Sequence, residues 1–309
     1  IMKSKLYKKK NVILLGGPTA SGKSDLAVNI AKLIDGEIIN ADSMQVYKNF
    51  PILTSQPSKS LQQSIKHHMY GYFDTNKSYN GSIWLKDTAK KISQITIAKK
   101  TPIIVGGTGL YLEFISSGIS HIPNISEETK GQVKELFEKK GLEEMFNFLR
   151  EIDPEYADKI NINDKLRINR ALEVFKETKK NISYFHKKRV ENNNYKFFKI
   201  FLAPTKEIIK INSKIRLEKM LKQGVLEEFN KNNIKVKSCN IQKAIGYQEI
   251  NDYYKNKITL SEMFEKIIFS TKKYSKRQFT WFNNRYNAHL KIDSIKKSSL
   301  ILETLSKIT

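Results

Sequence analysis

The sequence predicts an α/β fold in which a core with a parallel β-sheet is interrupted by a helical insertion. Three observations support this fold class. Apolar runs of strand length occur at 11–16, 37–40 and 101–105, and each run ends in small or polar residues. A helical pattern directly follows the first run. Between 118 and 195 the sequence becomes rich in Glu and Lys, has helical periodicity and shows no convincing strand.

These patterns divide the chain into a predicted core, residues 1–117 and 196–309, and a predicted helical insertion, residues 118–195. Strand character returns at 196–204, and helical patterns follow it. The polar run ENNN at 191–194 is the expected hinge or linker back to the core.

The sequence predicts the buried face of two helices and the first residue of a third. The runs 23–34 and 164–175 repeat apolar residues at helical spacing. The last helix is expected to open at Thr259, because Thr259 and Glu262 have the spacing of a capping box. The residues expected to face the core are Leu26, Ile30 and Leu33 in the first helix and Ile168, Ala171, Leu172 and Phe175 in the second.

Composition excludes several classes of protein. The chain has 309 residues, enough to bury a sizeable core. Its single cysteine, Cys239, cannot form an internal disulfide or a thiolate zinc site, so we expect it to be a packing residue. No apolar stretch approaches the roughly 18 residues of a membrane-spanning helix, and the short apolar run after the basic start leads directly into a glycine loop. We therefore expect a cytoplasmic protein without a membrane partner, and a monomer because no heptad pattern or apolar patch appears.

The charge indicates a polyanion partner. Lys and Arg number 55 against 31 Asp and Glu, which gives a formal net charge of +24. Such an excess is typical of nucleic-acid-binding proteins. The chain is also rich in Lys, Asn and Ile, as an AT-biased genome would make it, and that bias raises the charge without any ligand. Charge alone leaves both explanations open.

The run GPTASGKS at 17–24 fits the phosphate-loop pattern G-x-x-x-x-G-K-S, between a predicted strand and a predicted helix. It predicts a P-loop NTPase-like core. Backbone N–H groups of such a loop hold phosphate oxygens, Lys23 adds a mobile charge, and the Ser24 hydroxyl can bind Mg²⁺. The pattern does not require ATP, because a diphosphate offers equivalent oxygens. The predicted phosphate-binding residues are Gly17, Pro18, Thr19, Ala20, Ser21, Gly22, Lys23 and Ser24.

Two further strand ends carry candidate residues. Asp42 follows the strand at 37–40 and can act as a metal-supporting acid, as a proton acceptor or as a helix cap. Polar and aromatic residues follow it in DSMQVY, which suits contact with a nucleobase better than metal support alone. The run GGTGLY at 106–111 is a second glycine loop, with the Thr108 hydroxyl in its middle. Because ligands bind at the carboxyl ends of parallel strands, all three loops are expected to share one crevice.

Six motifs in order carry a resemblance to a known family. They are GPTASGKS, ADSMQVY, VGGTGLY, RALEV at 170–174, AIGYQE at 244–249 and KRQFTW at 276–281. Their order and spacing resemble those of bacterial tRNA dimethylallyltransferases, also called tRNA isopentenyltransferases, from residue 11 to about 282. The resemblance implies that the loop holds the diphosphate of dimethylallyl diphosphate and that no ATP is consumed. The allylic carbon would be transferred to N6 of the adenosine 3′ to the anticodon, position 37, which gives N6-isopentenyladenosine and diphosphate.

The resemblance also implies roles for particular residues. Asp42 matches the family's catalytic aspartate and would accept the N6 proton, since this amine is a poor nucleophile. Thr108 and Arg216 would act on the departing diphosphate together with Mg²⁺ on Ser24; a solvated helix arginine is the alternative for Arg216. The implied contacts to the anticodon stem-loop of tRNA are Asp42, Ser43, Met44, Gln45, Thr108, Lys130, Arg167, Arg170, Gly246, Tyr247, Lys276 and Arg277.

Some of these positions have simpler explanations or depart from the family. Arg167 and Arg170 also fit a solvated basic edge, and the aromatic residues of 272–282 are expected to be core rather than platforms for bases. Gln242 and Gln248 stand where relatives often have basic residues, and Gln56 stands where they have a lysine. His67 and His68 are expected to be structural, because no spaced acid or thiol completes a metal site.

Three other functions share part of this pattern. A P-loop small-molecule or nucleotide kinase would use ATP as donor, although kinases often carry an Arg-rich lid and Arg is sparse here. A prenyltransferase acting on free adenylate is expected to lack a large basic helical insertion such as 118–195. A non-catalytic RNA-binding P-loop protein would not need Asp42.

Overall fold

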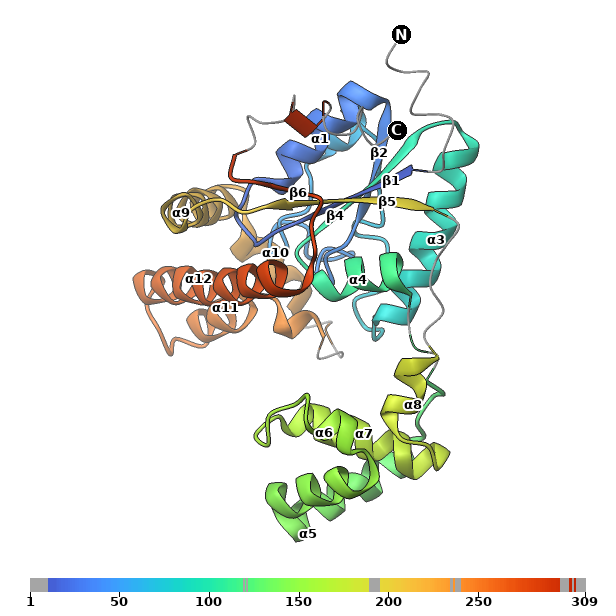
Figure 1. Cartoon of the computed structure of the whole chain (residues 1–309). Helices are drawn as coiled ribbons and strands as arrows, with labels where there is room; N and C mark the ends of the chain where they lie inside the picture. Colours follow the sequence, from blue (N-terminus) through green and yellow to red (C-terminus); the bar gives the residue numbers. More distant parts are fainter. Residues whose placement is uncertain are drawn as a thin grey trace. The chain divides into compact units, whose positions relative to one another are not determined.

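The computed structural model describes residues 11–118, 120, 122–188, 195–233, 236, 240–294, 300–301 and 303. The chain divides into two compact units, one formed by Ile1–Ser116 with Asn193–Thr309 and the other by Ser117–Asn192 (Figure 1). The predicted linker at 191–194 and Cys239 lie outside the described residues. None of the described helices combines the length and apolar composition of a membrane-crossing segment.

The first unit contains a sheet of six strands in the order β3-β2-β4-β1-β5-β6, and all neighbouring strands are parallel. This sheet confirms the α/β fold class, and all four predicted strands are present. β3 and β6 were not predicted, because strands of two and three residues are too short to show a pattern. The strands are β1 (Asn11–Gly16), β2 (Gly36–Asn40), β3 (His67–His68), β4 (Thr101–Gly106), β5 (Lys196–Leu202) and β6 (Leu290–Ile292).

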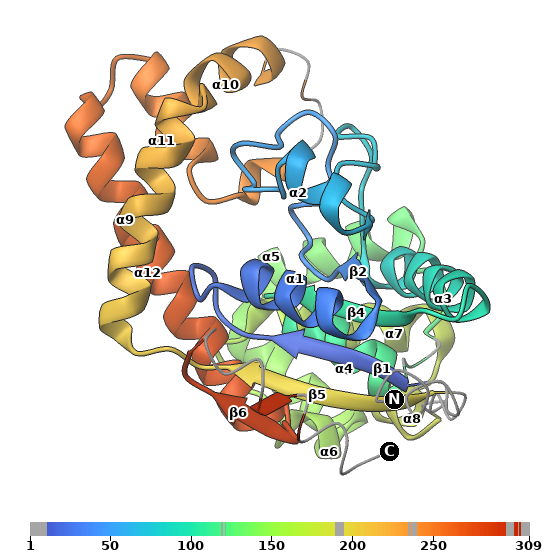
Figure 2. The same cartoon turned by 90° about the horizontal axis from the view of Figure 1, so that it is seen from above.

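Helices cover both faces of this sheet, and for that reason the central strands are continuously apolar. Successive residues of β1 point to opposite faces: Val12 and Leu14 belong to one buried cluster, Ile13 and Leu15 to another. The helices of the first unit are α1 (Lys23–Ile34), α2 (Lys59–Ser64), α3 (Gly81–Ile97), α4 (Gly109–Ser117), α9 (Lys206–Lys222), α10 (Val225–Asn233), α11 (Tyr247–Tyr254) and α12 (Leu260–Arg285). Figure 2 shows α9 and α12 crossing at one end of the sheet.

The register of the strands brings three loops to one edge of the sheet. Gly16 of β1 is paired with Gly106 of β4, and Asn40 of β2 is paired with Val105, which also belongs to β4. The loops that follow β1, β2 and β4 therefore begin side by side. This arrangement confirms that the three strand ends lie together, as expected for a parallel sheet.

The predicted buried face of α1 was partly wrong. Leu26 and Ile30 are buried, but Leu33 is 47% exposed. The buried face is centred on Ala27, Ala31 and Ile34, because small alanine side chains let the helix approach the sheet closely, and Leu33 lies at the margin of that face. In contrast, α12 begins as expected: the Glu262 N–H donates to Thr259 Oγ1 (3.2 Å), and the Thr259 N–H donates to Glu262 Oε2 (2.7 Å).

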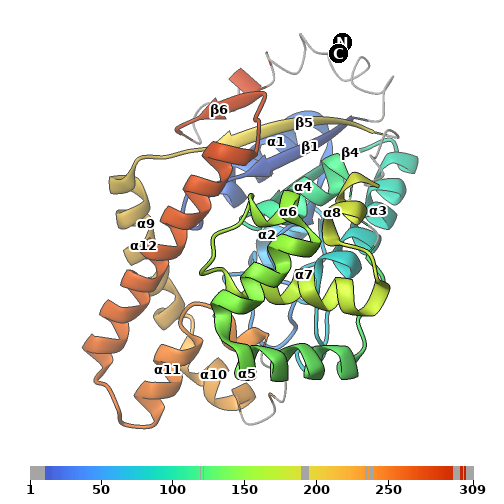
Figure 3. The same cartoon turned by 60° about the horizontal axis from the view of Figure 1, so that its bottom comes forward.

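The second unit is helical. It consists of α5 (Glu127–Ile152), α6 (Pro154–Ala157), α7 (Lys165–Thr178) and α8 (Ile182–Lys187), and Figure 3 shows α5 and α7 side by side. Ile168, Ala171 and Leu172 of α7 are buried against this unit's own core, as predicted, whereas Phe175 is only half-buried and makes an edge contact with Phe148.

The charge of the second unit corrects one expectation. Residues 117–192 contain 15 Lys and Arg against 14 Asp and Glu, so the insertion is helical but not basic overall. Almost all of the excess of 55 basic over 31 acidic residues therefore lies in the first unit. The sequence pattern was misleading here because lysines stand out in α5 and α7, although acids match them nearly one for one.

Candidate active site

The phosphate loop, residues 17–24, connects β1 to α1 as the motif requires. Gly22 has φ 89°, a left-handed conformation that favours glycine, and α1 starts at the next residue. Because Gly22 has no side chain to cap the helix, the first N–H groups of α1 remain available. A helix N-terminus with open amides is a site for phosphate or another anion.

Lys23 and Arg216 place two cations beside this loop. Lys23 Nζ donates to the Pro18 carbonyl and lies 3.5 Å from Ser21 Oγ. Burial lowers the pKa of Lys23 to about 7; the carboxylate of Asp42 opposes this change, and the nearby Arg216 adds to it. Burial also lowers the pKa of Arg216. Lys23 and Arg216 are both half-buried beside the Asp42 carboxylate, and two cations so placed make a site that an anion would stabilise.

Two helices from the far end of the chain hold the phosphate loop. From α9, Arg216 donates to Thr19 Oγ1 (2.6 Å) and Asn212 donates to the Ala20 carbonyl (2.9 Å). From α12, Ser275 Oγ donates to the Thr19 carbonyl (3.2 Å), and Gln278 Oε1 accepts the Thr19 N–H (2.8 Å). Thr19 is thus fixed through its N–H, its carbonyl and its hydroxyl.

The second glycine loop, residues 106–111, supports the backbone around Asp42. The Thr108 N–H donates to the Ala41 carbonyl (3.2 Å), and Thr108 Oγ1 accepts the Ser43 N–H (3.1 Å). A Cβ at Gly106 would lie only 2.0 Å from the Ala41 carbonyl oxygen, so this approach requires glycine. The two residues that flank Asp42 are therefore both bound to the loop after β4.

Asp42 does not cap a helix. Residues 43–50 form bends, turns and an isolated bridge between Tyr47 and Phe73, with no helix, and Asp42 Oδ1 accepts the Met44 N–H (2.8 Å). The Asp42 N–H donates to Asn40 Oδ1 (2.8 Å), and Asn40 is itself completely buried. The helix-cap alternative is therefore wrong, whereas metal support and proton acceptance both remain compatible with this position.

A cavity of about 650 Å³ joins these parts. Its lining contains residues 19–25 of the phosphate loop and α1, residues 42–45, and Gly106 and Gly107. The charged side chains along it are Lys23, Asp25, Asp42, Arg216, Lys219, Lys243, Lys273 and Arg277. Six cations against two carboxylates suit a ligand with several negative charges. Its volume is typical of a site for a small molecule.

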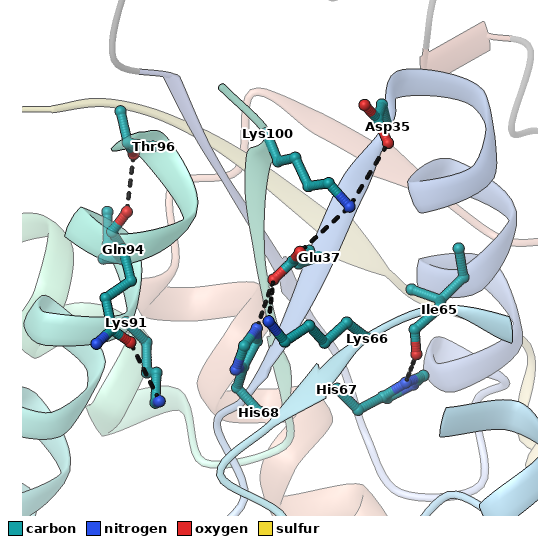
Figure 4. Close-up of polar contacts among 11 residues, drawn as sticks. Asp35, Glu37, Ile65, Lys66, His67, His68, Lys91, Gln94, Thr96 and Lys100 are labelled. Carbon is teal, nitrogen blue, oxygen red and sulfur yellow. Dashed lines mark hydrogen bonds and ion pairs between the residues drawn. The ribbon is translucent and has the colours of Figure 1, made fainter. Parts of the chain in front are cut away.

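The histidine pair belongs to a separate cluster at the start of β2 (Figure 4). His68 Nε2 lies 2.7 Å from Glu37 Oε2, Lys100 Nζ lies 3.2 Å from Glu37 Oε1, and His67 Nδ1 bonds to the Ile65 carbonyl. Burial lowers the pKa of His68, although Glu37 opposes this change. The described residues contain no group of three His, Cys, Asp or Glu that could hold a metal ion. Both imidazoles are thus engaged by protein groups, and their structural role stays a prediction.

Comparison with known proteins identifies the family. A family model described as IPP transferase matches residues 45–285. The chain belongs to the IPP transferase family. A curated tRNA dimethylallyltransferase of Pelagibacter ubique is 41% identical over an alignment of 314 positions, gaps included. The alignment covers 97% of this chain and 99% of that protein. The tRNA dimethylallyltransferase of Rickettsia canadensis is 40% identical, with 96% and 93% covered.

Solved structures of related proteins have the same fold as this IPP transferase. The full-length tRNA isopentenylpyrophosphate transferase from Bacillus halodurans is 28% identical, with a TM-score of 0.69 over 97% of this chain and 96% of that chain. A eukaryotic dimethylallyltransferase described as acting on tRNA is 25% identical, with a TM-score of 0.80 over 96% of this chain and 77% of that chain.

The predicted RNA contacts of this IPP transferase occupy different environments. Lys276 and Arg277 are exposed on α12. Tyr247 is only 3% exposed and packs against Phe50 and Phe229, so its side chain lies in the core, while Gly246 precedes α11 with φ 96°. Ser43, Met44 and Gln45 line the cavity. In the second unit, Lys130, Arg167 and Arg170 lie near Glu127, Asp164 and Glu173 respectively.

The departures from the family pattern have local partners. Gln56 Nε2 donates to the Tyr47 carbonyl (2.8 Å), and Gln248 Nε2 donates to Asp252 Oδ1 (2.9 Å). The aromatic residues of 272–282 are core only in part: Phe282 is 2% exposed and Phe279 lies against Phe201, but Tyr274, Phe279 and Trp281 are half-buried, and Tyr274 lines the cavity.

Sequence reasoning missed three residues that shape the site. Asn212 and Ser275 gave no signal, because a lone polar residue on a helix has many possible roles. Gln278 stands inside the motif KRQFTW, but the preceding Lys276 and Arg277 are charged and predict an exposed face at this part of the helix. Its burial, at 6% exposed, could be found only from the structure.

Proposed function

We propose that this IPP transferase transfers a dimethylallyl group from dimethylallyl diphosphate to N6 of adenosine 37 in tRNA, 3′ to the anticodon. The observation that carries the proposal is one cavity in which the phosphate loop and Arg216 face Asp42 and residues 43–45. The names of the relatives, tRNA dimethylallyltransferase, support the same reaction. The products are N6-isopentenyladenosine and diphosphate.

The loop side of the cavity would act on the leaving group. As the bond between the allylic carbon and the diphosphate oxygen breaks, negative charge accumulates on the diphosphate. The amides at the start of α1, Lys23 and Arg216 are fixed donors at that place, and fixed donors stabilise developing charge without reorganising. These groups account for departure of diphosphate without ATP.

Asp42 would act on the acceptor. The N6 lone pair is delocalised into the purine, so the amine attacks only if its proton is removed as the new C–N bond forms. The Asp42 carboxylate lines the cavity, and the bonds of Ala41 and Ser43 to the second glycine loop keep it in place. The proton would move from N6 to Asp42.

A magnesium ion fits the donors of this cavity. The Ser24 hydroxyl in the cavity lining is a hard oxygen ligand of the kind that a phosphate loop offers to Mg²⁺, and substrate phosphates and water usually complete the coordination. Bound there, Mg²⁺ would neutralise part of the diphosphate charge. The ion, the monomeric state and the cytoplasmic location stay predictions.

One incubation tests the reaction. The purified protein is mixed with Mg²⁺, labelled dimethylallyl diphosphate and an unmodified anticodon stem-loop, without ATP. Label on N6 of the adenosine 3′ to the anticodon is the expected result. Two parallel incubations add AMP or ATP. Label on AMP would instead indicate the adenylate prenyltransferase, and activity only in the presence of ATP would indicate the kinase.

Replacement of Lys276 and Arg277 by Ala is expected to weaken binding of the stem-loop and to flatten its salt dependence. Each lost phosphate contact should lower the slope of log K against log salt by roughly one. Filter binding at several salt concentrations measures the slope. The matched control replaces Lys86 and Lys90, two exposed lysines of α3, and removes the same charge. Equal slopes for both double variants would contradict a contact by α12.

The pKa of Lys23 predicts proton uptake when diphosphate binds. Its pKa of about 7 in the free protein means that most Lys23 is neutral above that pH, and a bound anion raises the pKa. Near pH 8 binding should therefore take up about one proton, and affinity should fall as pH rises above about 7. Calorimetry in buffers of different ionisation enthalpy measures the uptake.

Lys23→Arg is the control for this measurement. An arginine keeps its charge throughout this pH range, so the variant should bind diphosphate without that proton, and the difference from the wild type excludes protons taken up by diphosphate itself. The same uptake in both proteins would contradict the assignment to Lys23.

A further inference from the structure

Gln278 of α12 lies between the two glycine loops. Its side chain is buried, with 6% of the residue exposed. Oε1 accepts the Thr19 N–H of the phosphate loop (2.8 Å), and Nε2 donates to the Gly107 carbonyl of the second glycine loop (2.8 Å). One partner is a donor and the other an acceptor, so only one orientation of the amide satisfies both. The side chain therefore joins the two loops directly.

The fit around this amide is close on the side of the second loop. A Cβ at Gly107 would lie 2.3 Å from Gln278 Nε2 and 3.3 Å from Gln278 Cδ, and the next atom outside the adjoining residues, the Gly17 carbonyl oxygen, would be 3.5 Å away. Gly107 has no positive φ to explain its glycine. A side chain at Gly107 would therefore have to displace the amide of Gln278.

The contacts of Gln278 continue to both ends of the proposed reaction. On one side, Thr19 also binds Arg216, the proposed partner of the diphosphate. On the other side, Gly107 precedes Thr108, whose N–H and hydroxyl bind the residues that flank Asp42. A displacement of the amide would change the distance between the leaving-group side and the proton-acceptor side.

We infer that Gln278 is a positioning residue that sets the spacing between the phosphate loop and the loop supporting Asp42. This inference rests on the proposed function. Gln278 Oε1 and one N–H of Nε2 are engaged by the two loops, at a place where Gln278 also lines the cavity. A buried glutamine that only satisfies its own hydrogen bonds would stabilise α12 without affecting ligand binding, and an experiment separates the two cases.

Gln278→Met removes both hydrogen bonds at similar volume. We expect its affinity for inorganic diphosphate with Mg²⁺ to fall about 10- to 100-fold, since two buried hydrogen bonds that order the loop are lost. The kcat of prenyl transfer should fall as well, whereas the KM for the stem-loop should stay the same. Thr271→Val is the control: Thr271 is also buried on α12, but its hydroxyl bonds only within the helix, to the Ile267 carbonyl.

Gly107→Ala tests the same spacing from the other loop. Its added methyl should displace the amide and lower diphosphate affinity, and this effect should disappear in the background of Gln278→Ala, where the methyl has room. Such non-additivity is expected only if the two residues act through their contact. Purely additive effects would overturn the inference.

The outcomes distinguish this inference from the proposed function. If the wild type neither binds diphosphate nor prenylates RNA, both fail. If the wild type does both and Gln278→Met differs from it only in thermal stability, as Thr271→Val does, the positioning role is wrong and the proposed function stands. Should Gln278→Met fail to fold, the cycle between Gly107 and Gln278 decides the matter alone.

Discussion

Asp42→Ala is expected to lower kcat of prenyl transfer by about 10²- to 10³-fold, which corresponds to about 3 to 4 kcal/mol of transition-state stabilisation. The physical reason is that the described cavity lining contains two carboxylates, Asp42 and Asp25. Asp25 lies in the first turn of α1, on the side proposed for the diphosphate, which leaves Asp42 to accept the N6 proton. Single-turnover kinetics at saturating RNA measure the step, and the affinity for the stem-loop should change little.

Asp42→Asn separates proton acceptance from support of the turn. Its amide oxygen can still accept the Met44 N–H, but an amide has almost no basicity. We expect Asp42→Asn to be as slow as Asp42→Ala while keeping the wild-type melting temperature. Near-normal turnover of Asp42→Asn would show that Asp42 acts through the backbone and not as a base.

Arg216→Ala is expected to lower kcat/KM for dimethylallyl diphosphate by about 10²-fold. Two effects combine: the cation beside the leaving diphosphate is lost, and the Thr19 hydroxyl loses its donor. Arg216→Lys keeps the charge but not the planar donor geometry, so its activity should lie between those of the wild type and Arg216→Ala. Steady-state kinetics with varied diphosphate substrate measure both variants.

Arg285→Ala provides the matched control for Arg216. Arg285 is exposed in the last turn of α12 and does not line the cavity. Its variant should have a kcat/KM for dimethylallyl diphosphate within about twofold of the wild type. Equal losses in Arg216→Ala and Arg285→Ala would mean that overall charge, not contact with the loop, matters.

The sequence was sufficient where one local signal determines the structure. The apolar runs of β1, β2 and β4 are buried on both faces, so their composition is unambiguous, and the glycines of 17–24 predict the turn that connects β1 to α1. The start of α12 was predictable for the same reason, because its capping box is formed by Thr259 and Glu262, which are only three positions apart. Leu33 shows the limit: burial within α1 depends on how closely its alanines approach the sheet, which no helical pattern specifies.

The supports of the site were beyond sequence analysis for a different reason. Gln278 and Thr19 are separated by 259 positions, and Asn212 and Ala20 by 192. Such pairs become visible only when the fold brings them together. The distribution of charge was available in the sequence. The predicted insertion, residues 118–195, already contains 15 Lys and Arg against 14 Asp and Glu, so a count within these bounds is enough to show that it is nearly neutral.

The origin of the site's supports has a consequence for biosynthesis. The phosphate loop spans residues 17–24, yet Thr19 within it bonds to Gln278, and Gly16 just before it lies against Phe282. Chains are synthesised from the N-terminus, so β1 and its loop leave the ribosome long before α12 exists. The loop therefore receives its final shape only when translation has passed residue 278, and a nascent or truncated chain would carry the complete motif without a working binding site.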